Sequence, residues 1–197
     1  MKTENKITEL HPVTALLDVT VHFTDNEHYY SYTISEIYDP AKKDYFDLFF
    51  NFDPIVCDVT CQNDLVSTVV HDYLDSDSIF DIIENLNDLS DGKTEDQFMD
   101  ELELLHVYHQ CVDSPKIKSA CECVEDQNYI QISDCWTDQD LGFALASERG
   151  LLHQLDKIST EDTCFENYFD FDAYGRDCRI IEHWQKCNGS YWKFWEN

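Results

Sequence analysis

The chain has 197 residues, of which 43% are hydrophobic and 14% aromatic, enough for a folded core and too much for a disordered acidic tail. Forty-one aspartates and glutamates face 13 lysines and arginines, so the net charge is −28 at pH 7. A surface with this charge repels nucleic acids, anionic membranes and acidic substrates, and it attracts basic partners. The length predicts one compact domain or two to three small subdomains.

The N-terminal part is typical of β-strands. Leu17, Val19, Val21 and Phe23 alternate with polar residues, and residues 30–34 alternate in the same way. The pair Asp25-Asn26 between them suits a turn. Residues 44–52 are rich in aromatic side chains and fit a strand as well as a helix.

The middle of the chain is typical of helices. Ser78 suits the N-cap of a helix whose apolar stripe is Ile79, Ile82, Ile83 and Leu86, and Ser90-Asp-Gly92 breaks that helix. Thr94 and Gln97 form a capping-box pattern that opens a second helix. This helix is expected to bury Phe98, Leu102, Leu105 and Tyr108 and to end at Pro115.

The C-terminal part has a mixed pattern. Residues 129–132 suggest a short strand, and Ser133 or Thr137 then starts a helix that includes Leu141, Phe143, Leu145 and Leu152 and ends near Gly150. Asn188-Gly189 predicts a hairpin between strands at 179–185 and 190–195. The fold class expected is therefore α+β in three parts: a β-rich domain at 1–72, an acidic helical domain at 73–126 and an α+β domain at 127–197.

Acidic residues recur every three or four positions on the predicted helices, on the side away from the apolar stripe. Such carboxylates are spaced by roughly 5–6 Å, a distance comparable with the spacing of DNA phosphates. The charge of −28 equals that of about 14 base pairs of DNA. The predicted DNA-like acidic surface consists of Asp72, Asp75, Asp77, Asp81, Glu84, Asp88, Asp96, Asp100, Glu103, Asp134, Asp138, Asp140, Asp170 and Asp172.

Neither solubility nor adaptation to high salt accounts for the charge as well as DNA mimicry does. Solubility needs a net charge of only about 2–8, and adaptation to high salt does not predict nine cysteines. The chain lacks phosphate-binding glycine loops, nucleophile elbows and an EF-hand loop, so we expect no enzyme activity and no cofactor. A zinc site needs two C-x₂₋₄-C pairs, whereas Cys57/Cys61 is C-x₃-C and Cys121/Cys123, about sixty residues further on, is C-x-C; this favours buried free cysteines over a metal site.

A more specific signal lies in the run Asn167-Tyr-Phe-Asp-Phe-Asp-Ala-Tyr-Gly-Arg-Asp177, preceded by Gly150-Leu-Leu152. This region resembles the antirestriction motif of the ArdA family, DNA-mimic proteins carried by plasmids, conjugative transposons and phages. Further stretches similar to the family are Val70–Tyr73, Ile132–Cys135 with Asp140–Ala144, and Tyr191–Trp195. The resemblance covers roughly residues 70–197 and no motif in residues 1–69 matches.

The resemblance implies an elongated protein of three subdomains that forms a homodimer through its C-terminal domain. It also implies inhibition of type I restriction-modification enzymes by occupation of their DNA-binding cleft. The dimer contacts expected are Leu151, Leu155, Tyr168, Phe169 and Tyr174, and Arg176 is expected to pair with Asp172, Asp177 or another nearby carboxylate.

Two alternatives remain open at this point. The chain could mimic DNA toward another defence system, such as BREX or a CRISPR effector, or it could be an acidic module that sequesters basic proteins. No run of 18 apolar residues suggests a membrane span, and residues 1–6 lack the apolar core of a signal peptide. We therefore expect the protein to act in the cytoplasm of a bacterial host cell, without membrane or direct nucleic-acid binding.

Overall fold

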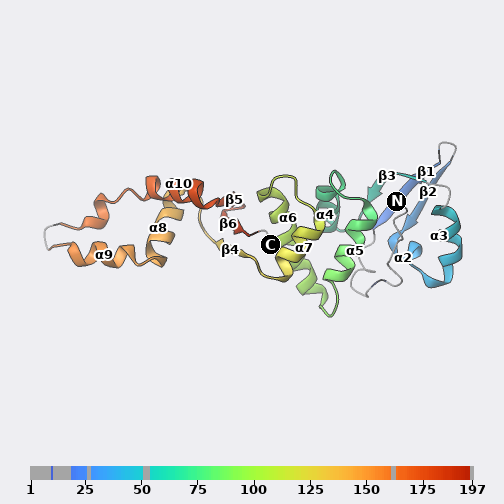
Figure 1. The fold of residues 1–197 in the computed structure, drawn as a ribbon, viewed down its shortest axis with the longest axis horizontal. Coiled ribbons are helices and arrows are strands. Elements are labelled where there is room, and N and C mark those ends of the chain that lie inside the picture. The colour runs from blue at the N-terminus through green and yellow to red at the C-terminus, as the bar shows by residue number, and fades with distance from the viewer. Residues whose placement is uncertain (1–9, 11–18, 26–27, 51–53, 161–162, 196–197) are drawn as a thin grey trace. The chain divides into compact units, whose positions relative to one another are not determined.

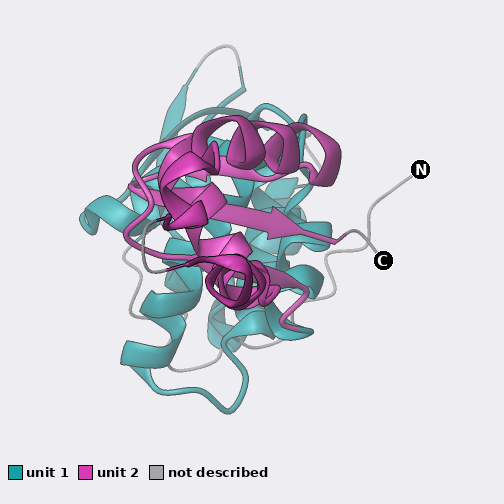
Figure 2. Ribbon diagram, turned by 90° about the vertical axis from the view of Figure 1, so that its left-hand side faces the viewer, with its two compact units in different colours: residues 1–126 teal, residues 127–197 magenta. Residues whose placement is uncertain are grey.

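The structure is a computed structural model that describes residues 10, 19–25, 28–50, 54–160 and 163–195. Its helices and strands form an α+β fold, as the sequence predicts. It divides into two compact units, residues 1–126 and residues 127–197, which Figure 2 distinguishes by colour. The expected boundary between residues 72 and 73 falls inside a helix, α4 (Asp64–Leu74), so the described parts of the first two expected segments form one unit.

Unit 1 opens with a three-stranded antiparallel sheet of β1 (Thr20–Thr24), β2 (Tyr29–Thr33) and β3 (Ile55–Thr60), in the order β2-β1-β3. Val21 and Phe23 are fully buried, which confirms the predicted alternation. A short helix, α2 (Ile34–Ile37), and a 3₁₀ turn, η1 (Pro40–Lys42), follow β2. Leu17 and Asn26 lie outside the described residues.

The aromatic segment that fits either strand or helix is helical over α3 (Lys43–Phe50). The Phe49 and Phe50 rings lie 5.4 and 5.7 Å from the ring of Phe23, so α3 covers one face of the sheet (Figure 1). Phe50 also contacts Phe80 of the following helical part at 5.3 Å. This shared aromatic core is the physical reason why sheet and helices belong to one unit.

Four helices complete unit 1: α4, α5 (Ile79–Leu89), α6 (Glu95–Cys111) and α7 (Ile117–Glu125). The predicted caps are confirmed: the Ser78 hydroxyl accepts from Asp81 N–H, and Thr94 and Gln97 form the capping box. The predicted apolar residues of α5 and α6 are buried. Helix α6 ends at Cys111, before the expected stop at Pro115, and α7 was not predicted.

Unit 2 combines a sheet of order β4-β6-β5 with three helices. Its elements are β4 (Tyr129–Ile132), α8 (Asp138–Glu148), α9 (Leu151–Ile158), the 3₁₀ turn η2 (Phe165–Tyr168), α10 (Phe171–Glu182), β5 (Gln185–Cys187) and β6 (Ser190–Phe194). The predicted hairpin is confirmed, because Asn188 and Gly189 have φ angles of 48° and 71°, which a type I′ turn requires.

One strand boundary predicted in this unit is wrong and one residue was assigned to the wrong helix, whereas α8 ends at Glu148, near Gly150 as predicted. Residues 179–182 were expected in a strand but form the last turn of α10, which the Asp170 side chain caps. Leu152 was expected in the same helix as Leu141, but Gly150 adopts a left-handed backbone with φ 71° and separates α8 from α9.

Helices α8 and α10 cross at very short range. Gly142 and Gly175 face each other at the crossing: a Cβ added to Gly175 would lie 1.8 Å from the Asp138 carbonyl oxygen, and one added to Gly142 would lie 1.9 Å from that of Phe171. The core beside the crossing includes Leu141, Leu145 and Cys178. Gly142 and Gly175 therefore set the distance between these helices, and they lie in the two separate segments 140–144 and 167–177 of the sequence.

Candidate acidic interaction surface

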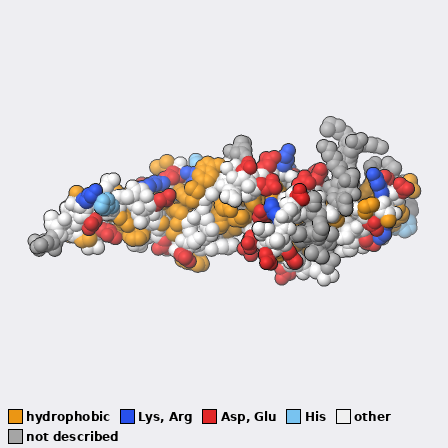
Figure 3. Space-filling model, turned by 90° about the horizontal axis from the view of Figure 1, so that it is seen from below, with side chains coloured by type: hydrophobic (Ala, Val, Ile, Leu, Met, Phe, Trp, Pro, Cys, Tyr) orange, Lys and Arg blue, Asp and Glu red, His pale blue; other side chains and the backbone are white. Residues whose placement is uncertain are grey.

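The predicted acidic face of α5 and α6 lies on the surface of unit 1. Asp88, Asp96, Asp100 and Glu103 are exposed, whereas Asp81 and Glu84 are half-buried. None of the four exposed carboxylates forms an ion pair with a described residue. Figure 3 shows acidic side chains gathered over this helical part of the unit. We call these four residues the outer carboxylates.

The lysines of the helical part are all engaged by other carboxylates. Lys93 lies 2.7 Å from Glu101 and 4.0 Å from Glu125, and Lys116 lies 3.7 Å from Asp77. Lys118 pairs with Glu122 at 3.8 Å. These cations therefore neutralise carboxylates elsewhere and leave the charge of the outer carboxylates uncompensated.

Three predicted residues at the end of α4 differ in their surroundings. The Asp72 carboxylate lies 2.6 Å from Nδ1 of His106 and 3.7 Å from Nδ1 of His109. Asp77 accepts a hydrogen bond of 3.0 Å from the backbone N–H of Ile117 and thereby fixes the start of α7. Asp75 is exposed. Asp72 and Asp77 thus have structural partners within the chain.

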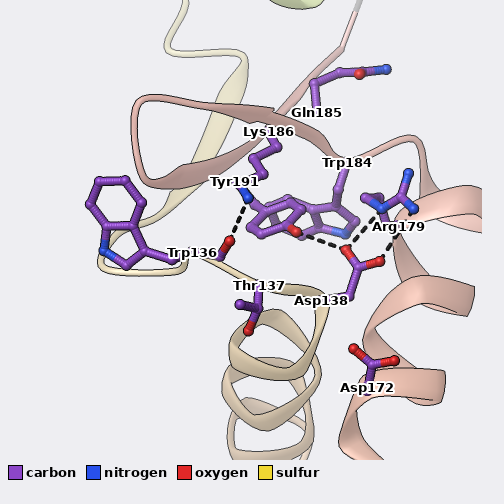
Figure 4. Close-up of a pocket in the computed structure, with 9 residues that line it drawn as sticks. All are labelled: Trp136, Thr137, Asp138, Asp172, Arg179, Trp184, Gln185, Lys186 and Tyr191. Atoms are coloured by element: carbon purple, nitrogen blue, oxygen red, sulfur yellow. Dashed lines mark hydrogen bonds and ion pairs between the residues drawn. The ribbon is translucent and has the colours of Figure 1, made fainter.

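In unit 2, Asp138 holds together α8, α10 and β6 (Figure 4). Its carboxylate accepts from Nε of Arg179 at 2.9 Å and from the Tyr191 hydroxyl at 2.7 Å. Burial raises the pKa of Asp138, but the hydrogen bonds from Arg179 and Tyr191 outweigh it, so the pKa lies below its ordinary value. The charge of Asp138 is therefore compensated within the chain, unlike that of the outer carboxylates.

Asp140 also has a local role, because its carboxylate completes the N-terminal cap of α8. It accepts from the Thr137 hydroxyl at 2.8 Å and from the backbone N–H of Trp136 at 3.0 Å, and these bonds lower the Asp140 pKa. Asp170 caps α10 by accepting from Ala173 N–H at 2.9 Å. Asp134 and Asp172 are exposed and form no ion pair with a described residue.

The dimer contacts expected from the resemblance lie along α9, η2 and α10. Leu151 and Leu155 are half-buried on α9, a helix without a fully buried side chain, and Tyr168 is 78% exposed. The Phe169 ring lies 5.5 Å from that of Tyr174, whose hydroxyl accepts from Arg149. Helix α9 is therefore amphipathic, and its apolar side is partly exposed to solvent.

Arg176 lies 3.7 Å from Asp177, as predicted. Among the exposed carboxylates that the predicted surface leaves out are Glu95, Glu122 and Glu125. Two of them lie on α7, whose signal is the helical spacing of its buried residues Ile117, Ala120, Cys121 and Val124.

The cysteines are free thiols, and four of them are buried: Cys121, Cys123, Cys135 and Cys178. Burial raises the pKa of Cys123 to about 11, so this thiol is protonated at neutral pH. Among the described residues, no three His, Cys, Asp or Glu side chains are arranged to hold a metal ion. None of the described helices has the length and apolar character needed to cross a membrane.

Comparison of the chain with protein-family models, with curated proteins and with solved structures finds no match.

Proposed function

We propose that this chain is a non-enzymatic DNA mimic that inhibits type I restriction-modification enzymes by occupying their DNA-binding cleft, as the resemblance to the ArdA family implies. It needs no cofactor and acts as a homodimer in the cytoplasm of a bacterial host. The observation that carries the proposal is the outer carboxylates, whose charge the neighbouring lysines leave uncompensated.

The mechanism is competition for basic side chains. A DNA-binding cleft presents lysines and arginines at phosphate spacing, and carboxylates on successive helical turns are spaced on a similar scale. Each exposed ion pair contributes at most about 1 kcal/mol, so affinity arises from the whole array and decreases as salt screens it. No single carboxylate is then essential.

The first experiment is a competition assay. A type I methyltransferase complex bound to labelled DNA containing its recognition site is titrated with the protein, in parallel with an unrelated protein of matched negative charge. Displacement near stoichiometry by this protein alone supports mimicry. Equal, weak displacement by both favours the acidic module that sequesters basic proteins. No displacement by either directs the search to BREX or CRISPR effectors.

A charge-matched pair of variants separates the outer carboxylates from bulk charge. In the first variant the four outer carboxylates become amides, and in the control the same number of exposed aspartates change on β3 and on helices α3 and α4: Asp44, Asp47, Asp58 and Asp64. The first variant is expected to lose about 1 to 4 kcal/mol of binding free energy, fivefold to several hundredfold in affinity. An equal loss in the control would contradict the proposed location of the surface.

Single substitutions sharpen this test. Asp96→Asn alone is expected to weaken binding by no more than about fivefold, since one exposed ion pair is lost. Complete loss of inhibition from that one change would point to a discrete site in place of a distributed surface.

A further inference from the structure

Trp136 is an unusually placed tryptophan. It lies in the loop between β4 and α8 and is 65% exposed, whereas Trp184 and Trp192 are 4% and 6% exposed. The other exposed tryptophan, Trp195, already has the Lys193 ammonium 5.8 Å from its ring centroid. No cation of the described chain lies over the Trp136 ring in this way.

The Trp136 side chain is exposed but not loosely held. Its backbone N–H donates to Asp140 at 3.0 Å, and its carbonyl accepts from the Lys186 ammonium. The ring rests on the hairpin turn, because a Cβ added to Gly189 would lie 2.5 Å from Cζ2 of the indole. In Figure 4 the ring points away from the Asp138–Arg179 pair. A ring fixed in this manner loses little conformational entropy when a partner covers it.

The charge around Trp136 favours a cationic partner. Trp136 and Asp172 both line a hollow of about 510 Å³, and Asp134 lies two residues before Trp136 in the same loop. Both carboxylates are exposed and without an ion pair to a described residue. The two cations in the hollow already have partners: Arg179 donates to Asp138, and Lys186, which donates to the Trp136 carbonyl, is close enough to Asp138 and Asp140 to lower the pKa of both carboxyl groups.

From this arrangement we infer that Trp136 is the anchor by which unit 2 binds an arginine side chain of its basic protein partner. The guanidinium stacks on the indole face while Asp172 or Asp134 balances its charge. Tryptophan is the side chain that binds cations best through its ring face, and rigid tryptophans are frequent hot spots of protein interfaces. The inference deepens the proposed function, because it assigns one specific contact within an otherwise distributed electrostatic interface.

The test compares the wild type with two Trp136 variants, and with Asp172→Asn, in the methyltransferase competition assay over a series of salt concentrations. Trp136→Phe keeps an aromatic face, and Trp136→Leu keeps apolar cover on Gly189 but removes the π system. We expect Trp136→Leu to weaken binding roughly tenfold or more and Trp136→Phe to weaken it less. The slope of log K against log salt should not change in either, since no charge is removed, whereas Asp172→Asn should reduce it.

Ile181→Ala serves as the matched control, because Ile181 is 75% exposed in the same unit. Wild-type affinity in Trp136→Leu overturns the inference, and equal losses in the Phe and Leu variants overturn the assignment of a cation. Intrinsic fluorescence of the remaining tryptophans checks that each variant is folded.

A second measurement keeps this inference separate from the proposed function. If the wild-type protein does not displace DNA, the proposed function fails. The inference is then decided by NMR, in which a tri-arginine peptide is titrated against the indole N–H signals. A shift of the Trp136 signal that exceeds that of Trp195 supports it, and equal or absent shifts overturn it.

Discussion

Gly175→Ala tests the crossing of α8 and α10 directly. The added methyl group would lie 1.8 Å from the Asp138 carbonyl oxygen and 2.6 Å from the Gly142 nitrogen. Both neighbours are backbone atoms, so no rotamer change relieves the contact. Since Cβ atoms do not approach other atoms within 3.0 Å, the helices must separate by at least about 1.2 Å, the difference between 3.0 and 1.8 Å.

The cost follows from the packing beside the glycines. A gap of about 1 Å loses a quarter to a half of the dispersion contacts across it, and Leu141 and Leu145, which are 0% and 1% exposed, lie in that core. Overpacking and lost contacts together cost about 3 to 5 kcal/mol. Alanine regains about 1 kcal/mol of helix propensity, which leaves a net loss of about 2 to 4 kcal/mol.

The assay exploits the distribution of tryptophans. All four of them, Trp136, Trp184, Trp192 and Trp195, lie in unit 2, so fluorescence excited at 295 nm follows the unfolding of that unit alone. A unit of this size has about 4 to 11 kcal/mol of stability in total. With a urea m-value near 1 kcal/mol/M, the unfolding midpoint should fall by about 2 to 4 M.

The matched control is Asp177→Ala on the same helix, an exposed position where the expected change is within about 0.5 kcal/mol. Gly142→Ala should destabilise unit 2 by a similar amount to Gly175→Ala. The double variant should lose less than the sum, because helices that have already separated accommodate the second methyl group. Wild-type stability in Gly175→Ala, or strict additivity of the two changes, would refute the close crossing.

Three further predictions concern single contacts. Asp138→Asn should destabilise unit 2 by about 1 to 3 kcal/mol at pH 7, since Arg179 loses its charged acceptor. Because folding lowers the pKa of Asp138, the urea-derived difference from wild type should be complete above about pH 5 and shrink as pH falls below about 3.9; a difference that grows on acidification would contradict the ion pair. Tyr73→Phe removes the buried hydrogen bond to the Leu105 carbonyl and should cost about 1 kcal/mol of unfolding free energy measured by circular dichroism. Thr94→Ala removes the cap of α6 and should cost about 1 kcal/mol in the same measurement, and no change would argue against the capping box.

The accuracy of the sequence-based predictions depended on how local the deciding interactions are. Ser78 and Thr94 were identified correctly as caps because an N-cap bonds a backbone N–H within the next helical turn. Residues 44–52 did not distinguish a helix from a strand, since aromatic side chains fit both the helical and the strand repeat until the sheet that they cover is known. Residues 179–182 were assigned wrongly to a strand, because the Asn188-Gly189 turn indicates a hairpin but does not determine how far its strands extend.

The same distinction between local and long-range interactions applies to the residues of the candidate acidic surface. The exposure of Asp88, Asp96 and Asp100 follows from helical periodicity, which places them opposite a buried apolar stripe. The engagement of Asp77 by the start of α7 and of Asp138 by Arg179 joins positions 40 and 41 residues apart. No periodic pattern encodes such pairs.

The sequence by itself determined the charge of −28, the mixed helix and strand content, and the faces of the helices that carry acids, because composition and periodicity are local properties. Only the tertiary structure decided which carboxylates keep their charge uncompensated, why Gly142 and Gly175 are glycines, and that Trp136 stands in solvent on a rigid turn. These features depend on contacts between residues distant in the chain, and such contacts exist only once the helices and strands have packed.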